Sequence, residues 1–153
     1  MSSTISKTLD YFPFYKVDQT SWQLIANQPL QDVWPQLEEH INRSIVTDDI
    51  ELLQLICLDS KNRVINSEII AIGTINCVHA KIRYVAEKAL KSKVFGIILA
   101  HNHTSGNTTP SWDDVTYTKT LHHAFNLLNI FLVDHLVVGP DSIFSMRRNC
   151  LIF

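Results

Sequence analysis

Residues 94–100 (VFGIILA) form a short, continuous apolar run, and this run limits the choice of fold more than any other feature of the chain. An apolar run of this length without polar alternation is typical of a strand that is buried on both faces. Such a strand lies inside a sheet that other elements cover from both sides. The run therefore predicts a layered domain built around a sheet.

Helical and strand patterns alternate along the rest of the chain. Helices are expected at residues 32–45, 81–92 and 111–128, and strands at 52–58, 64–72, 130–138 and 143–146. This alternation predicts the α/β class, with a mixed central sheet flanked by helices. Residues 1–45 are expected to be a helical lead-in packed on the domain, and residues 46–153 the single globular domain itself.

Composition narrows the classes of function. Thirteen Lys and Arg against fifteen Asp and Glu give a net charge of -2, which predicts no sequence-independent binding to a phosphate backbone. The three scattered cysteines are expected to be buried thiols in a reducing compartment: Cys57, Cys77 and Cys150. No apolar run approaches the length of a membrane span, so a soluble cytoplasmic protein is expected.

The polar segment after the apolar run carries the candidate chemistry. His101 and His103 lie two residues apart at the end of a strand, so both imidazoles can face one point. Ser111 and Asp114 follow after a seven-residue loop, at the start of the next helix. Two nitrogens and one carboxylate suit Zn²⁺ and leave a fourth position open for water, as in catalytic zinc sites.

Each part of this segment also has a simpler reading. The histidine pair alone is equally explained by two polar loop residues. Ser111 alone is a helix N-cap, and Asp113 and Asp114 alone are first-turn carboxylates that favour the helix dipole. Together, at the spacing H-x-H-x7-S-x2-D, they form the JAMM motif and favour a metal site.

The chain resembles the RadC-like JAB domain family, and the resemblance covers about residues 50–153. The matching blocks are 64–74 (VINSEIIAIGT), Arg83, Ala89-Leu90, 97–106 (IILAHNHTSG), 109–114 (TPSWDD), 134–139 (DHLVVG) and 144–145. The resemblance implies a cytidine-deaminase-like α-β-α sandwich of the JAB/MPN+ type.

The resemblance also implies roles for individual residues. His101, His103 and Asp114 take the place of the ligands of one zinc ion. Glu68 takes the place of the glutamate that activates the water at the metal, and Ser111 that of the serine that stabilises the oxyanion. Without the motif, Glu68 would be an outward-facing residue of a half-buried strand. The implied function is a zinc-dependent metallopeptidase or isopeptidase acting on a peptide or isopeptide substrate.

Two other functions remain as alternatives. One is a DNA-associated repair or mobile-element accessory protein of the RadC family, and the other is a binding module without turnover. Longer RadC proteins carry a helix-hairpin-helix module, whose hairpin needs glycines. Residues 1–72 contain none, so a short stand-alone member is expected. A homodimer is left open.

The departures from the family pattern lie at Thr104, at residues 82–84 (IRY) and at Arg148, and they concern the substrate groove rather than the metal. Trp34 and Trp112 are expected to be packing residues. Asp134 and His135, in the middle of a strand, are expected to be structural and to orient a neighbouring loop through hydrogen bonds.

Overall fold

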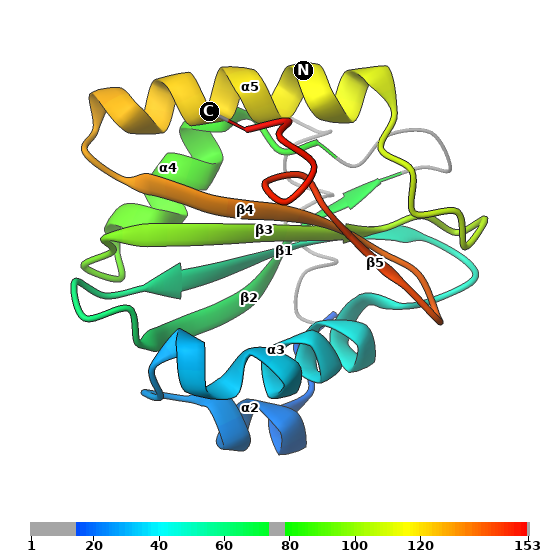
Figure 1. Cartoon of the computed structure of the whole chain (residues 1–153), viewed down its shortest axis with the longest axis horizontal. Helices are drawn as coiled ribbons and strands as arrows, with labels where there is room; N and C mark the ends of the chain where they lie inside the picture. Colours follow the sequence, from blue (N-terminus) through cyan, green and yellow to red (C-terminus); the bar gives the residue numbers. More distant parts are fainter. Residues whose placement is uncertain (1–14, 74–78, 153) are drawn as a thin grey trace, which may run out of the picture.

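The computed structural model describes residues 15–73 and 79–152, which form one mixed sheet between two layers of helices (Figure 1). The helices are α2 (Gln19–Ile25), α3 (Leu30–Ile45), α4 (Ile82–Leu90) and α5 (Trp112–Leu127). The strands are β1 (Glu51–Leu58), β2 (Val64–Gly73), β3 (Gly96–Asn102), β4 (Phe131–Val138) and β5 (Ile143–Ser145).

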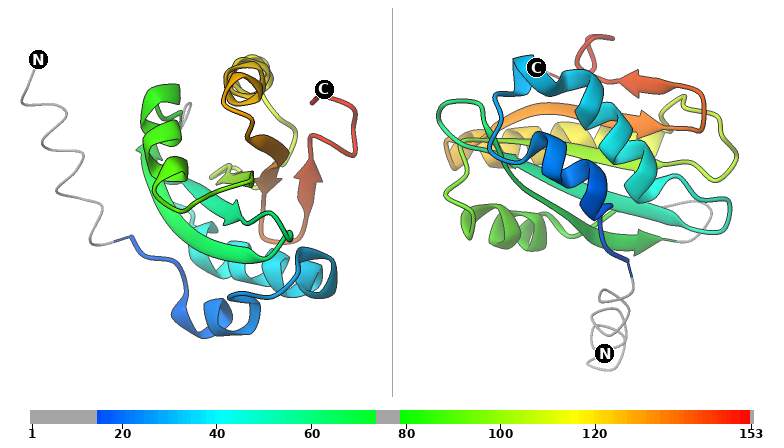
Figure 2. Two further views of the ribbon diagram at one scale, coloured as in Figure 1. Left: turned by 90° about the vertical axis from the view of Figure 1, so that its left-hand side faces the viewer. Right: turned by 90° about the horizontal axis from the view of Figure 1, so that it is seen from below.

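The sheet has the strand order β2-β1-β3-β4-β5. β3 pairs with β4 in parallel, and the other neighbouring strands pair antiparallel. Figure 2 shows α2 and α3 on one face of the sheet and α4 and α5 on the other. Each face has its own apolar core, because β1 and β3 bury side chains on both sides. The predicted α-β-α sandwich with a mixed sheet is confirmed.

Two strand boundaries differ from the prediction in a way that matters for the site. β3 begins at Gly96 rather than at Val94, and it continues through His101 to Asn102. The shift arises because Lys93 has a positive φ of 51°, which closes a turn before the chain can extend. β1 begins at Glu51 rather than at Leu52, so an acidic residue lies within the ladder.

A buried polar network attaches the N-terminal helices to the sheet. His40 of α3 lies 2.8 Å from Ser21 Oγ of α2 through Nδ1 and 2.8 Å from Ser67 Oγ of β2 through Nε2. Apolar residues of α3, among them Leu37 and Ile41, fill the core on the same face. Helices α2 and α3 therefore pack on the sheet. Residues 1–14 of the expected lead-in lie outside the described residues.

The described cysteines differ from one another. Cys57 is buried in β1, and burial raises the pKa of its thiol to about 12. Cys150 is exposed, so the prediction that it is buried is wrong. Cys77 lies outside the described residues. No helix in the described part of the chain is both long and apolar enough to cross a membrane.

Candidate metal centre

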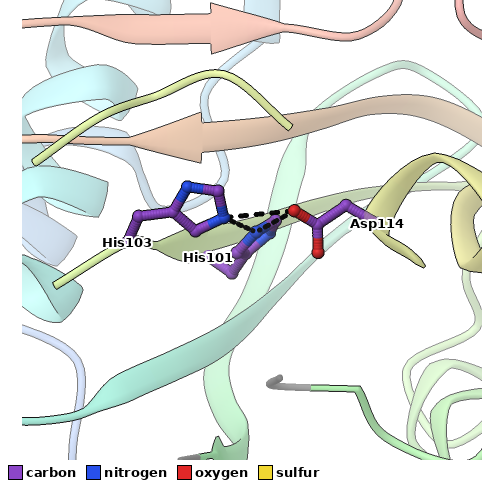
Figure 3. A group of neighbouring side chains, drawn as sticks. All are labelled: His101, His103 and Asp114. Atoms are coloured by element: carbon purple, nitrogen blue, oxygen red, sulfur yellow. Dashed lines mark hydrogen bonds and ion pairs between the residues drawn. The ribbon is translucent and has the colours of Figure 1, made fainter. Parts of the chain in front are cut away.

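His101, His103 and Asp114 converge at the carboxyl end of β3 and form the metal-site cluster (Figure 3). The Nε2 atoms of the two imidazoles lie 3.1 Å apart. Asp114 Oδ2 lies 3.1 Å from His103 Nε2 and 3.3 Å from His101 Nε2. Ligand atoms that bind one Zn²⁺ tetrahedrally at about 2.0–2.1 Å stand about 3.3 Å from one another. The three side chains therefore have the chemistry and the spacing of a zinc-ligand set.

The local sequence that begins α5 also positions Asp114. Ser111 is the N-cap of α5, as predicted, and its Oγ accepts from the Asp114 backbone N–H at 3.0 Å. In return, Asp114 Oδ2 accepts from the Ser111 backbone N–H at 2.9 Å. This reciprocal capping box satisfies two N–H groups at the helix end. It also holds the carboxylate toward the two imidazoles.

His79, which precedes α4, holds the other oxygen of the Asp114 carboxylate. Its Nε2 atom lies 3.0 Å from Asp114 Oδ1, and its ring stacks on Tyr117 of α5 with ring centroids 4.4 Å apart. Burial by itself raises the pKa of Asp114, but the three neighbouring histidines outweigh it and hold that pKa far below its usual range. Asp114 is therefore an anion, the form that binds a divalent cation.

In both histidines of the cluster, the Nδ1 atom contacts a group outside the cluster. His103 Nδ1 lies 2.7 Å from the backbone oxygen of Asn107, which can only accept, so Nδ1 carries a proton. His101 Nδ1 lies 2.8 Å from Nε2 of His135. Burial lowers the pKa of His101, whereas the hydrogen bond with Asp114 raises that of His103. A metal ion would therefore compete with a proton at His103.

Glu51 is a second carboxyl group at the site, and sequence reasoning missed it. It is 5% exposed. Leu53 of β1 lies opposite His101, so the antiparallel register carried two residues further places Glu51 across from His103. Burial raises the pKa of Glu51, and the nearby charges of His103 and Asp114 act in opposite directions. Glu51 is thus a buried acid beside the cluster that binds a proton more tightly than an ordinary glutamate.

Glu68, which the resemblance implied as the water-activating residue, lies elsewhere on the same face of the sheet. It is opposite Leu55 of β1, which is itself opposite Leu99 of β3. Two strand spacings, roughly 10 Å, thus separate its backbone from β3. Its Oε2 atom lies 3.3 Å from Lys88 Nζ of α4. No hydrogen bond or ion pair joins Glu68 to the metal-site cluster within the described part of the chain.

The loop that follows His103 packs directly against the end of β4. Gly106 has a positive φ of 79°, and its backbone oxygen would lie 2.8 Å from a Cβ atom added to Gly139. That distance is too short for a real contact, so Gly139 must lack a side chain for the loop to keep this position. The loop connects His103 to Ser111, the N-cap residue that positions Asp114.

Gly139→Ala is therefore expected to push this loop away from β4 and to disturb the cluster. We expect a loss of about 1–3 kcal/mol in the free energy of unfolding, as in other overpacked positions, together with weaker zinc binding. Urea denaturation of the metal-free protein and a competition titration with a zinc chelator measure the two effects. Unchanged values in both experiments would contradict the close contact between the loop and Gly139.

Trp112, the first residue of α5, is 82% exposed, so the prediction that it packs in the interior is wrong. It directly follows Ser111, the N-cap of α5. Trp34 does pack against the core on the other face of the sheet, and its Nε1 donates to Glu38 Oε1 at 2.7 Å. Trp112 thus exposes a large apolar side chain at the start of α5.

Comparison with known proteins agrees with this architecture. The model of the RadC-like JAB domain family matches residues 31–151. A UPF0758 protein of Roseiflexus castenholzii is 40% identical over 105 residues, which is 69% of this chain and 45% of the relative. A UPF0758 protein of Haemophilus influenzae is 37% identical over 105 residues, 69% of this chain and 48% of the relative.

A third relative, from Aquifex aeolicus, is 40% identical over 98 residues, 64% of this chain and 42% of the relative. The chain thus spans about half the length of the curated relatives it matches. The family model covers most of the chain, including α3 from its second residue, the whole sheet and every residue of the metal-site cluster. The chain therefore belongs to the RadC-like JAB domain family.

Proposed function

We propose that the protein is a zinc-dependent hydrolase that cleaves a peptide or isopeptide bond. The observation that carries the proposal is the convergence of His101 Nε2, His103 Nε2 and Asp114 Oδ2 beside the buried carboxyl group of Glu51. Three protein ligands leave a fourth position of a tetrahedral ion open, which is the arrangement of catalytic rather than structural zinc sites. A bound Zn²⁺ would polarise the scissile carbonyl group and acidify a water molecule.

We assign the role of general base to Glu51 rather than to Glu68. Burial shifts the pKa of Glu51 upward, toward neutral pH, and a group whose pKa is closer to the working pH can both take up and return a proton. A hydrogen bond with the Thr104 backbone acts in the opposite direction on this pKa, but burial outweighs it. Glu51 would take a proton from the attacking water and pass it to the leaving amine.

We assign Ser111 to the stabilisation of the developing oxyanion. Its Oγ accepts a hydrogen bond from the helix end, which leaves the hydroxyl proton free to donate to a substrate oxygen. A hydroxyl in this position would stabilise negative charge only as that charge forms.

A pair of variants separates the capping role of Ser111 from the proposed catalytic role. Ser111→Ala is expected to lower kcat and also to destabilise α5 by about 1 kcal/mol, whereas glycine at an N-cap costs only a few tenths. Ser111→Gly is therefore expected to lose the same turnover with little loss of stability. Steady-state kinetics and thermal unfolding measure the two effects. Wild-type turnover in the Ser111→Gly variant would leave Ser111 as a helix cap only.

The DNA-associated alternative receives little support from the charges on the described surface. The densest basic segment lies around α4, where Arg83 Nε is 3.1 Å from Glu87 Oε1 and Lys88 Nζ is 3.3 Å from Glu68 Oε2. Cations already paired with carboxylates contribute less to phosphate binding than free ones. We therefore expect weak binding to DNA at physiological salt.

One experiment tests the proposal against this alternative. Zinc-loaded protein is screened against peptide and isopeptide substrates, and its binding to single- and double-stranded DNA is titrated with salt. Hydrolysis that stops after chelation of the metal and in the Glu51→Gln variant is the expected result. Sub-micromolar DNA binding near about 150 mM salt, with no hydrolysis of any substrate, would overturn the proposal.

A further inference from the structure

His135 is a buried group that the proposed mechanism does not use. It lies in the middle of β4, next to Leu99 in the parallel pair with β3, and it is 0% exposed. Its Nε2 atom lies 2.8 Å from His101 Nδ1, and its Nδ1 atom lies 2.5 Å from Thr118 Oγ1 of α5. The ring therefore connects a residue of the metal-site cluster to the helix that covers this face of the sheet.

The direction of each hydrogen bond in this series follows from its last acceptor, the backbone oxygen of Asp114. Thr118 Oγ1 lies 2.6 Å from the backbone oxygen of Asp114, which can only accept, so the single hydroxyl proton is used there. Toward His135 the hydroxyl can offer only a lone pair, and His135 Nδ1 must be the donor. A fully buried imidazole without a carboxylate partner is neutral, because a buried unpaired charge is costly. Its Nε2 atom therefore has no proton and accepts from His101.

This order places the proton of His101 on Nδ1 and leaves the lone pair on Nε2. The Nε2 atom is the one that lies 3.1 Å from His103 Nε2 and 3.3 Å from Asp114 Oδ2. Which nitrogen of a histidine can bind a metal depends on the hydrogen bond that the other nitrogen makes. In His103 the Nδ1 proton is fixed by the backbone oxygen of Asn107, whereas in His101 it depends on side chains.

We propose that His135 and Thr118 form a directional hydrogen-bond relay that holds His101 in the Nδ1–H form and so keeps its Nε2 free for the metal ion. The inference rests on the metal site of the proposed function but not on hydrolysis. The relay ends on the backbone of Asp114, so it also joins two of the three ligands, one from β3 and one from α5. His135 and Thr118 are thus positioning residues that act through His101.

A matched pair of variants at Thr118 tests the relay with little change in volume. Thr118→Val removes the hydroxyl that sets the direction of the His135 ring, whereas Thr118→Ser keeps it. Loss of a residue that hydrogen-bonds a metal-ligating side chain typically weakens metal binding by 10–100-fold. We expect a loss of this size in Thr118→Val, by competition with a chromogenic zinc chelator, and near wild-type affinity in Thr118→Ser.

His135 is tested in the same way. His135→Leu removes the acceptor for the His101 proton and is expected to weaken zinc binding by a similar factor. His135→Gln offers an amide oxygen in place of Nε2 and is expected to recover part of the loss. Thermal unfolding of the metal-free variants shows which of them fold, and the Thr118 pair decides the outcome if His135→Leu does not fold.

The second readout is the proton position itself. Long-range ¹H–¹⁵N NMR correlations of the metal-free wild-type protein are expected to show His101 with its proton on Nδ1, and those of Thr118→Val a mixture of both forms. A proton on His101 Nε2 in the wild type, or wild-type zinc affinity in folded Thr118→Val and His135→Leu, would overturn the relay. A wild type that binds no zinc but has the Nδ1 proton would instead contradict the proposed function and leave the relay standing.

Discussion

Replacing His101, His103 or Asp114 singly by alanine is expected to leave the protein folded but almost free of zinc. The wild type, purified without added metal, is expected to contain about one zinc per chain by elemental analysis. Each of these side chains supplies one of three converging atoms, so each substitution would remove one of the three proposed bonds to the ion. The loss of zinc affinity should exceed the 10–100-fold loss that is typical when a hydrogen-bond partner of a metal ligand is removed.

The chain offers matched controls for these substitutions. Asp113 precedes Asp114 in the same helical turn but is exposed, and His123 is exposed further along α5. Asp113→Ala and His123→Ala are expected to keep the metal, with at most about 0.3–1 kcal/mol lost at Asp113 from the helix dipole. Unchanged metal content in all three ligand variants would show that the ion, if present, binds elsewhere.

Removal of the metal provides a second measurement of the same site. A ligand that binds the folded state stabilises it by an amount that grows with the logarithm of its concentration over Kd. A chelator is therefore expected to lower the Tm of the wild type and of Asp113→Ala. It should leave the Tm of the His101, His103 and Asp114 variants unchanged, because these have no bound ion to lose.

Glu51→Gln is expected to abolish hydrolysis while zinc remains bound. The amide can still accept the hydrogen bond from the Thr104 backbone N–H, but it cannot take up a proton. Removal of a general base typically lowers kcat by 10²–10⁴-fold. Turnover of the best substrate from the screen and zinc content, measured on the same samples, test this expectation.

Glu68→Gln is the matched control, because it makes the same chemical change in the neighbouring strand. Glu68 is partly exposed and pairs with Lys88, and surface ion pairs contribute about 0–1 kcal/mol. We expect nearly normal turnover and stability in this variant. A large loss of turnover in Glu68→Gln with normal turnover in Glu51→Gln would return the role of base to Glu68. Normal turnover in both variants would contradict a carboxylate base at either position.

The sequence alone determined those features that depend on short stretches of chain. His101 and His103 point to one side because side chains alternate along a strand. Ser111 and Asp114 meet because residues three apart at a helix start can form a capping box. The apolar run at 94–100 indicated a central strand because only a doubly covered strand needs no polar face. These local rules sufficed to predict the three proposed ligands and the layered fold.

The tertiary structure decided which distant residues surround the three ligands. Glu51 and Glu68 lie at the start and the middle of two adjacent apolar strands, and nothing local distinguishes their roles. The sequence did hold one signal for Glu51. Glu51 and Leu53 are two residues apart in β1 and so share a face of the sheet, and Leu53 is paired with His101. This signal can be used only when the register of β1 against β3 is known. His79 likewise meets Asp114 only through the packing of α4 and α5.

His135 shows the same division between local sequence and long-range pairing. Its position in a strand was predicted, but its contact with His101 arises from the parallel pairing of β3 with β4, which are joined through α5. Register between strands that are far apart in sequence is set by the packing of the whole sheet rather than by neighbouring residues. The proposed ligands could therefore be identified from one continuous segment of the chain. The base and the relay that we assign depend on the assembly of three strands, β1, β3 and β4, with the helix α5.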